Sequence, residues 1–114
     1  MLLRASSRAI DAEVDVAGAI ASGDGGVPHG LLLAQFAEAA TRASDDLPRA
    51  RAALLDAVGG EPFVEAAATV GIFNGLVRVA DATGIPLDPA TRAGSAALRQ
   101  ALALDAFPGA RNAP

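Results

Sequence analysis

Apolar residues recur every three to four positions along most of the chain, and glycine or proline separates the apolar segments. This periodicity predicts α-helices, and no segment shows the alternation of a half-buried strand. The expected helices cover 12–22, 29–43, 48–58, 62–83 and 89–105. The fold class is therefore expected to be all-α, a compact bundle of about five helices. One domain is expected over residues 1–106, with a C-terminal tail over 107–114.

The expected helix ends carry capping signals. A polar residue followed by proline is typical of an N-terminus, and a glycine after the last apolar position is typical of a C-terminus. The N-terminal signals are Ile10-Asp11, Asp45-Asp46 with Pro48, and Asp88-Pro89. The C-terminal signals are Gly23, Gly59-Gly60 and Gly84.

The helix expected at 29–43 is amphipathic. Its apolar and polar residues lie on opposite sides, as in a helix that packs against a core. The apolar face holds Leu32, Leu33, Phe36, Ala39, Ala40 and Ala43, and the polar face holds Gln35, Glu38 and Arg42.

The helix expected at 62–83 carries apolar residues on more than one face. At 100° per residue, one arc is expected to face the core: Ala66, Val70, Phe73, Leu76, Val77 and Ala80. A neighbouring arc has almost no side-chain volume and contains Ala68, Gly71, Gly75 and Ala82. A glycine inside a helix costs about 1 kcal/mol relative to alanine, so two glycines four residues apart predict close approach by another helix. We expect this helix at the centre of the bundle or in a subunit interface, with the small residues as interface candidates.

A narrow polar stripe on the same helix is the candidate binding site. It consists of Asn74, Arg78 and Asp81, and the spacing allows Arg78 to pair with Asp81 along the helix. If the stripe faces solvent, it is an ordinary polar surface of the helix with no binding role. A covered stripe would place the arginine to hold an interface or an anionic ligand, and the residues alone leave both options open.

Composition favours a partner subunit. The chain has 114 residues, of which 52% are hydrophobic, but only four are phenylalanine and many are alanine. Alanine buries little area, so few large side chains are left to stabilise a core. The mean hydropathy of +0.35 is high for a small domain with a relatively large surface. We therefore expect a homo-oligomer in which another subunit covers part of the apolar surface.

Several kinds of chemistry are excluded by composition. The chain has no cysteine and one histidine, so disulfides, thiolate nucleophiles, cysteine zinc sites and histidine clusters are absent. The net charge is -4 and all nine basic residues are arginine, which excludes the basic surface that nucleic acid requires. We expect no cofactor, no metal and no catalytic residue.

A membrane partner is not expected. No run approaches about 18 uninterrupted apolar residues. The longest candidate, 63–82, is interrupted by Glu65, Asn74, Arg78 and Asp81. The expected location is the cytoplasm.

Other chemistry-bearing residues have ordinary explanations. The only histidine, His29, lies at a helix start, and no serine lies in the strand–turn–helix context of a hydrolase nucleophile. The glycine-rich loop 23–26 lacks the lysine and hydroxyl residue of a phosphate-binding loop. The carboxylate pairs 45/46 and 61/65 lie at helix starts, where acidic groups complement the helix dipole.

Two runs, Leu33–Arg42 and Val64–Asp88, carry a motif. The first contains Phe36-Ala37 and Thr41-Arg42, and the second contains Phe73-Asn74, Arg78 and the ending Gly84-Ile85-Pro86-Leu87-Asp88. Over residues 31–88, about half the chain, the sequence resembles the C-terminal part of the alkylhydroperoxidase/carboxymuconolactone decarboxylase-like family, in its peroxidase-related members. Val77 replaces the second asparagine of that pattern.

The resemblance implies an all-helical fold and assembly into dimers, trimers or larger rings. The peroxidatic activity of that family depends on a Cys-x-x-Cys pair and a nearby histidine, on a helix upstream of the matching region. This chain contains no cysteine, so the resemblance transfers no catalytic residue.

These observations leave three functional hypotheses. The leading one is a non-catalytic, degenerate alkylhydroperoxidase-like domain that acts as an oligomerising scaffold. The second is a truncated fragment of a family enzyme whose redox helix lies upstream of Met1. The third is a small-molecule binding module in which Arg78 holds an anionic ligand.

Overall fold

The computed structural model describes residues 14–108, and every regular element in this part of the chain is helical. In chain order these are α2 (Val16–Ser22), α3 (Gly30–Arg42), α4 (Leu47–Val58), α5 (Gly60–Thr83), α6 (Pro89–Ala101) and the short 3-10 helix η1 (Leu104–Ala106). The five α-helices confirm the all-α prediction.

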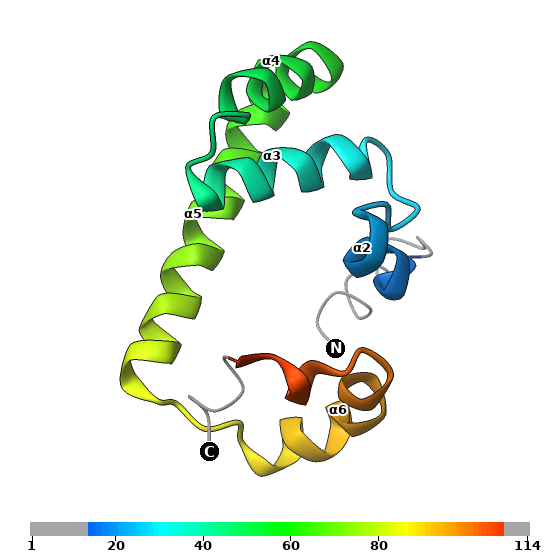
Figure 1. The fold of residues 1–114 in the computed structure, drawn as a ribbon, viewed down its shortest axis with the longest axis vertical. Helices are drawn as coiled ribbons and strands as arrows, with labels where there is room; N and C mark the ends of the chain where they lie inside the picture. The colour runs from blue at the N-terminus through cyan, green and yellow to red at the C-terminus, as the bar shows by residue number, and fades with distance from the viewer. Residues whose placement is uncertain (1–13, 109–114) are drawn as a thin grey trace.

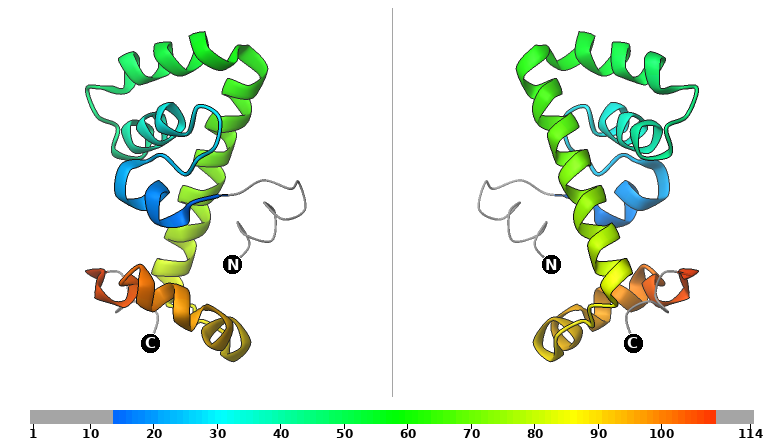
Figure 2. Two further views of the ribbon diagram at one scale, coloured as in Figure 1. Left: turned by 90° about the vertical axis from the view of Figure 1, so that its right-hand side faces the viewer. Right: turned by 90° about the vertical axis from the view of Figure 1, so that its left-hand side faces the viewer.

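The helices are arranged around α5. Helices α3 and α4 contact each other and the N-terminal half of α5, while α2 contacts α3. Helix α6 contacts η1 and lies beyond the far end of α5, so the ribbon in Figure 1 has an open, C-like outline. Figure 2 shows the C-terminal half of α5 extending away from α3 and α4. The chain is thus a three-helix cluster with two peripheral units.

The core lies where α3, α4 and α5 meet. Leu54 of α4 is fully buried, and Phe36 and Ala39 of α3 are each only 5% exposed. The Phe36 ring contacts the Phe63 ring of α5, with centroids 5.3 Å apart and a tilt of 58°. Burial of Phe36 and Ala39 agrees with the apolar face expected for the second predicted helix.

Local signals at the start of α6 and the end of α5 are confirmed. Gly84 ends α5 in the left-handed conformation with φ 64°, which glycine adopts without steric cost. Asp88 caps α6, where its side chain accepts a hydrogen bond of 2.9 Å from the Thr91 backbone N–H. Hydrogen bonds from Thr91, first from its side chain and then from its backbone, lower the pKa of the Asp88 carboxyl.

The first and last predicted helices are shorter than expected. Helix α2 begins at Val16 because the Asp15 N–H donates to the Gly25 carbonyl at 3.0 Å, which holds the preceding backbone extended. The Ile10-Asp11 signal lies outside the described residues. Helix α6 ends at Ala101 because Ala103 has a left-handed backbone with φ 50°, and η1 follows instead of a continued helix.

Asp46 stabilises the start of α4 without a side-chain cap. Its backbone is at the N-cap position, but its carboxylate accepts a 2.9 Å hydrogen bond from Arg49 Nη2 instead of from a backbone N–H. Pro48 lies in the first turn, as expected. Gly59, with φ 80°, then joins α4 to α5 through a single non-helical residue. This tight joint brings α4 back against α5.

The chain is more open than the expected compact bundle. Its radius of gyration is 15.4 Å, whereas a compact domain of this length has about 13 Å. Its accessible surface is 8224 Å², whereas a compact monomer of the same mass exposes about 5,700 Å². The excess of about 2,500 Å² follows from helices that pack on only one side.

Half of the core arc expected on the long helix is in fact exposed. Ala66, Val70 and Ala80 are half-buried, as a core-facing position would be. Phe73, Leu76 and Val77 were expected in the core and are exposed. At 100° per residue Phe73 and Leu76 point away from the side of α5 on which Asn74 contacts α3, and all three residues are more than half exposed.

Helix α5 also meets the length and composition criteria for a membrane-spanning helix. Residues Gly60–Thr83 form one helix of 24 residues with a mean window hydropathy of 1.4, and none of that window is buried. Buried core helices of soluble proteins meet the same criteria, but they are covered by neighbouring elements. The unusual property of α5 is therefore its lack of cover.

Truncation of the buried leucine tests the position of the core. Leu54→Ala removes a side chain that is fully buried between α3, α4 and α5, so we expect a loss of about 2–5 kcal/mol in unfolding free energy. Leu55→Ala is the matched control, because Leu55 is the next residue and is 42% exposed. Urea denaturation measures both, and an equal effect of the two substitutions would contradict this core.

Candidate functional site

The polar stripe of α5 is divided by the fold. Asn74 is half-buried, and its side-chain Nδ2 donates to Thr41 Oγ1 of α3 at 3.0 Å and to the Val70 carbonyl at 2.9 Å. Arg78 and Asp81 are exposed. The spacing allows an ion pair between Arg78 and Asp81, but the structure shows none between these two residues. Arg78 is therefore not neutralised by its nearest carboxylate on α5.

Asn74 and Arg78 line a groove between α3 and α5, which we call the α3–α5 groove. Its volume is about 370 Å³. It is lined by Phe36, Ala40, Thr41, Ala67, Val70, Gly71, Asn74 and Arg78. One part of the wall is aliphatic and aromatic, and the other part is polar. Asp81 is not among the lining residues, so only two residues of the predicted stripe are brought together in a concave site.

Thr41 is a site residue that sequence reasoning missed. It lies 33 residues before Asn74 and on another helix, so no local spacing connects the two. One feature of the sequence could have indicated Thr41: it lies beside the polar face of the helix expected at 29–43. A threonine there could contact a polar residue on a neighbouring helix.

A second groove lies between α3 and α4 and contains more charge. Its volume is about 390 Å³, and its wall includes Glu38, Arg42, Asp46 and Arg49. Arg42 pairs with Glu38 one turn earlier, and Arg49 pairs with Asp46 at 2.9 Å. Each arginine of this groove thus already has a carboxylate partner, which leaves no uncompensated charge for a ligand.

The remaining sequence candidates lie in ordinary structural positions. His29 is exposed and adopts a left-handed backbone with φ 58° at the start of α3. The hydroxyls of Ser22 and Ser95 donate to carbonyls of their own helices. In the loop 23–26, the Asp24 carboxylate accepts from the Gly26 N–H at 3.0 Å, which closes a turn. Within residues 14–108 no group of three histidine or acidic side chains is positioned to hold a metal ion.

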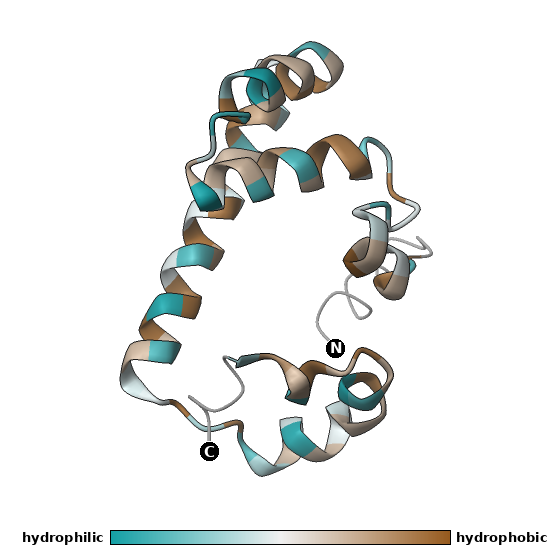
Figure 3. Ribbon diagram, in the orientation of Figure 1, coloured by the Kyte–Doolittle hydropathy of each residue, from teal (hydrophilic) through white to brown (hydrophobic). Residues whose placement is uncertain are grey.

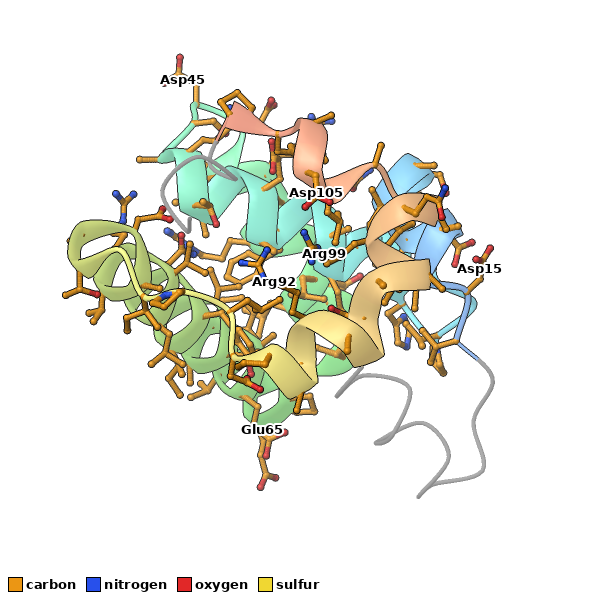
Figure 4. The ribbon with its side chains drawn as sticks, turned by 90° about the horizontal axis from the view of Figure 1, so that it is seen from below. Asp15, Asp45, Glu65, Arg92, Arg99 and Asp105 are labelled. Carbon is orange, nitrogen blue, oxygen red and sulfur yellow. The ribbon has the colours of Figure 1, made fainter. Side chains whose placement is uncertain are left out.

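Glu65, one of the acidic helix-start candidates, faces solvent, whereas Arg99 of the C-terminal ion pair is partly covered. Glu65 points away from the rest of the molecule (Figure 4). Arg99 of α6 donates through Nε to the Asp105 carboxylate of η1 at 3.1 Å, and Figure 4 shows the two side chains facing each other. This ion pair holds η1 against α6, and each of its two charged groups neutralises the other.

Most of the small-residue arc of α5 lies on a face that no described element covers, and Gly71 at its edge lines the α3–α5 groove. Gly71 and Gly75 have nothing within 4 Å of the position that a Cβ atom would occupy. At 100° per residue, Gly75 shares one arc with five other exposed residues, and we call these six the outer face: Val64, Ala68, Ile72, Gly75, Val79 and Ala82. The half-buried residues Phe63 and Val70 lie on the opposite side of the helix.

The views of the whole molecule agree with this assignment. In Figure 1, α5 forms one edge of the molecule, with the other helices on its inner side. Figure 3 shows apolar segments along the length of α5. Val64, Ile72 and Val79 are between 57% and 63% exposed. The outer face is thus an apolar surface with small residues among large ones.

No protein-family model matches this sequence, and no curated protein or solved structure was found to be similar to it. The resemblance to alkylhydroperoxidase-like domains therefore stays a prediction.

A double-mutant cycle tests the contact that forms the polar end of the α3–α5 groove. Asn74→Ala and Thr41→Ala each remove one partner of the 3.0 Å hydrogen bond between α5 and α3. We expect a coupling free energy of about 0.5–1.5 kcal/mol between the two substitutions, measured by chemical denaturation. Thr69→Ala is the control partner, because its hydroxyl bonds to the Glu65 carbonyl within α5. Strictly additive effects of Asn74→Ala and Thr41→Ala would contradict the contact.

Proposed function

We propose that this chain is a non-catalytic, oligomer-forming structural domain, and that a second copy covers the outer face of α5. The observation that carries the proposal is a 24-residue helix in which no residue is fully buried. Apart from a narrow polar stripe, its apolar residues occupy several faces, and a helix of that kind belongs in an interior or an interface.

The exposed side chains give the driving force. The three large residues of the outer face, Val64, Ile72 and Val79, are between 57% and 63% exposed. Three more large apolar residues elsewhere on α5 are between 56% and 62% exposed: Phe73, Leu76 and Val77. Burial of apolar surface contributes about 25 cal/mol per Å². A patch of this extent along one helix is typical of a protein interaction site rather than of a monomer surface.

The glycines support a helix as the partner. Gly75 lies inside α5, where glycine costs about 1 kcal/mol relative to alanine. No described atom lies within 4 Å of the position that a Cβ atom would occupy there, so contacts among the described residues do not explain why this position is a glycine. A second helix that crosses close to Gly75 and Ala68 would use the space that their small side chains leave. Small residues permit such close backbone approach.

The open shape of the chain leaves surface for an interface. A typical interface buries about 800 Å² on each partner. The whole chain exposes about 2,500 Å² more than a compact monomer of its mass, and the outer face is one part of that surface. The sequence also resembles the alkylhydroperoxidase-like family, whose members form dimers, trimers and larger rings, and this resemblance supports the proposed association.

A lipid bilayer is the competing cover for α5. It is disfavoured by the charges on the helix, since Glu65, Arg78 and Asp81 would each have to enter or cross the hydrocarbon region. Helices α3 and α4 also pack against α5, and the Glu38–Arg42 pair of α3 would be carried toward the bilayer with it. A second copy requires no burial of these charged groups.

Gly75→Leu tests the proposed interface. We expect the wild-type chain to sediment as a dimer or larger oligomer, and we expect Gly75→Leu to weaken association about tenfold or more because the leucine blocks close approach. The monomer fold should be retained, since the chain leaves the Cβ position open and leucine favours the helix. Sedimentation equilibrium measures the association, and circular dichroism measures the fold.

Gly60→Leu is the matched control for that experiment. Gly60 is also open around its Cβ position, but it lies at the start of α5 and outside the outer face. We expect its association to equal that of the wild type. A folded wild-type chain that sediments as a monomer would contradict the proposal, and so would recovery of the chain in a membrane fraction.

A further inference from the structure

The α3–α5 groove has an apolar part and a polar part. Phe36, Ala67 and Val70 form the apolar wall, and Thr41, Asn74 and Arg78 form the polar end. A volume of about 370 Å³ lies within the range of small-molecule sites. The groove is lined only by residues of α3 and α5 of one chain, so its formation does not require the proposed dimer, although Gly71 at its edge adjoins the outer face.

Thr41 presents a hydroxyl hydrogen that has no acceptor among residues 14–108. Its oxygen accepts from Asn74 Nδ2, so the hydroxyl can still donate. Thr69 and Thr83 use their hydroxyls to donate to the carbonyl four residues earlier, at 2.8 Å and 2.7 Å. Thr41 makes no such bond, although it lies in the last turn of α3. The free donor is therefore specific to the groove.

Asn74 holds the Thr41 side chain in place by donating a hydrogen bond to its hydroxyl oxygen. Its Nδ2 must face the Val70 carbonyl, because a carbonyl oxygen can only accept. The same nitrogen donates to Thr41, which uses both amide hydrogens within the chain. Asn74 is thus a positioning residue that leaves Thr41 and Arg78 as the two donors for a ligand.

Arg78 supplies the charge. It lines the groove one turn after Asn74 and forms no ion pair with a described residue. A guanidinium presents two parallel N–H groups that match the two oxygens of a carboxylate. We propose that the α3–α5 groove binds a small amphipathic monocarboxylate, whose carboxylate contacts Arg78 and Thr41 and whose apolar tail lies against Phe36, Ala67 and Val70.

The charge balance favours a monocarboxylate over a phosphate. A phosphate group carries close to two negative charges and accepts from more donors than one guanidinium and one hydroxyl provide. Asp81 follows Arg78 by three residues, and its carboxylate further disfavours a dianion. The apolar wall adds affinity only for a ligand with a hydrocarbon tail.

Titration with sodium octanoate, followed by NMR chemical shifts of the full chain, tests this site. We expect saturable binding that Arg78→Leu weakens about tenfold and that Thr41→Val weakens less. The matched control is Arg51→Leu, because Arg51 is an exposed arginine of α4 outside the groove, and its octanoate affinity should equal that of the wild type. Octan-1-ol should bind at least tenfold more weakly than octanoate, and inorganic phosphate should not bind saturably.

The outcomes separate this site from the proposed dimer. Octanoate binding that is retained in Gly75→Leu supports a groove that is independent of the outer face, even if the chain proves to be a monomer. Equal octanoate affinity in Arg78→Leu and Arg51→Leu would overturn the proposal. Failure of the folded wild type to bind octanoate saturably would also overturn it, and saturable binding of phosphate with no binding of octanoate would assign the groove to a different anion.

Discussion

The structure depends on how α5 is covered. This helix supplies the surface on which α3 and α4 pack, and the buried Phe36 ring of α3 contacts the Phe63 ring of α5. The same helix carries apolar residues on several faces beside its narrow polar stripe, yet α3 and α4 cover only one side of it. Water contact with the remaining apolar surface is unfavourable in proportion to its area. The openness of the chain and the proposed association of two copies follow from this single property.

The two sides of α5 have different chemistry. The inner side joins α3 through the Asn74–Thr41 hydrogen bond and carries Arg78 beside an apolar wall. The outer side has no charged group among its six residues, and the glycine at its centre permits a close backbone contact. One side is therefore suited to a small amphipathic ligand and the other to a second helix. The two surfaces adjoin at Gly71, which lines the groove and lies beside the outer face.

The sequence predicted local features better than it predicted contacts between distant residues. The ends marked by Gly84 and Asp88 were correct, because a left-handed glycine and a capping carboxylate act within a few residues. The exposure of Phe73 was missed, since periodicity shows which residues share a face but not whether another element covers that face. Thr41 was missed as the partner of Asn74 for a related reason, because their contact depends on how α3 crosses α5.

The distance between two copies of α5 tests the central claim most directly. Since the chain contains no cysteine, Glu65→Cys introduces a single thiol for a nitroxide label at a solvent-facing position beside the outer face. Pulsed electron paramagnetic resonance should then report one well-defined distance between labels in two chains, and Gly75→Leu in the same background should abolish it. A uniform background decay from the folded, labelled chain, with no defined distance, would contradict a second copy on α5.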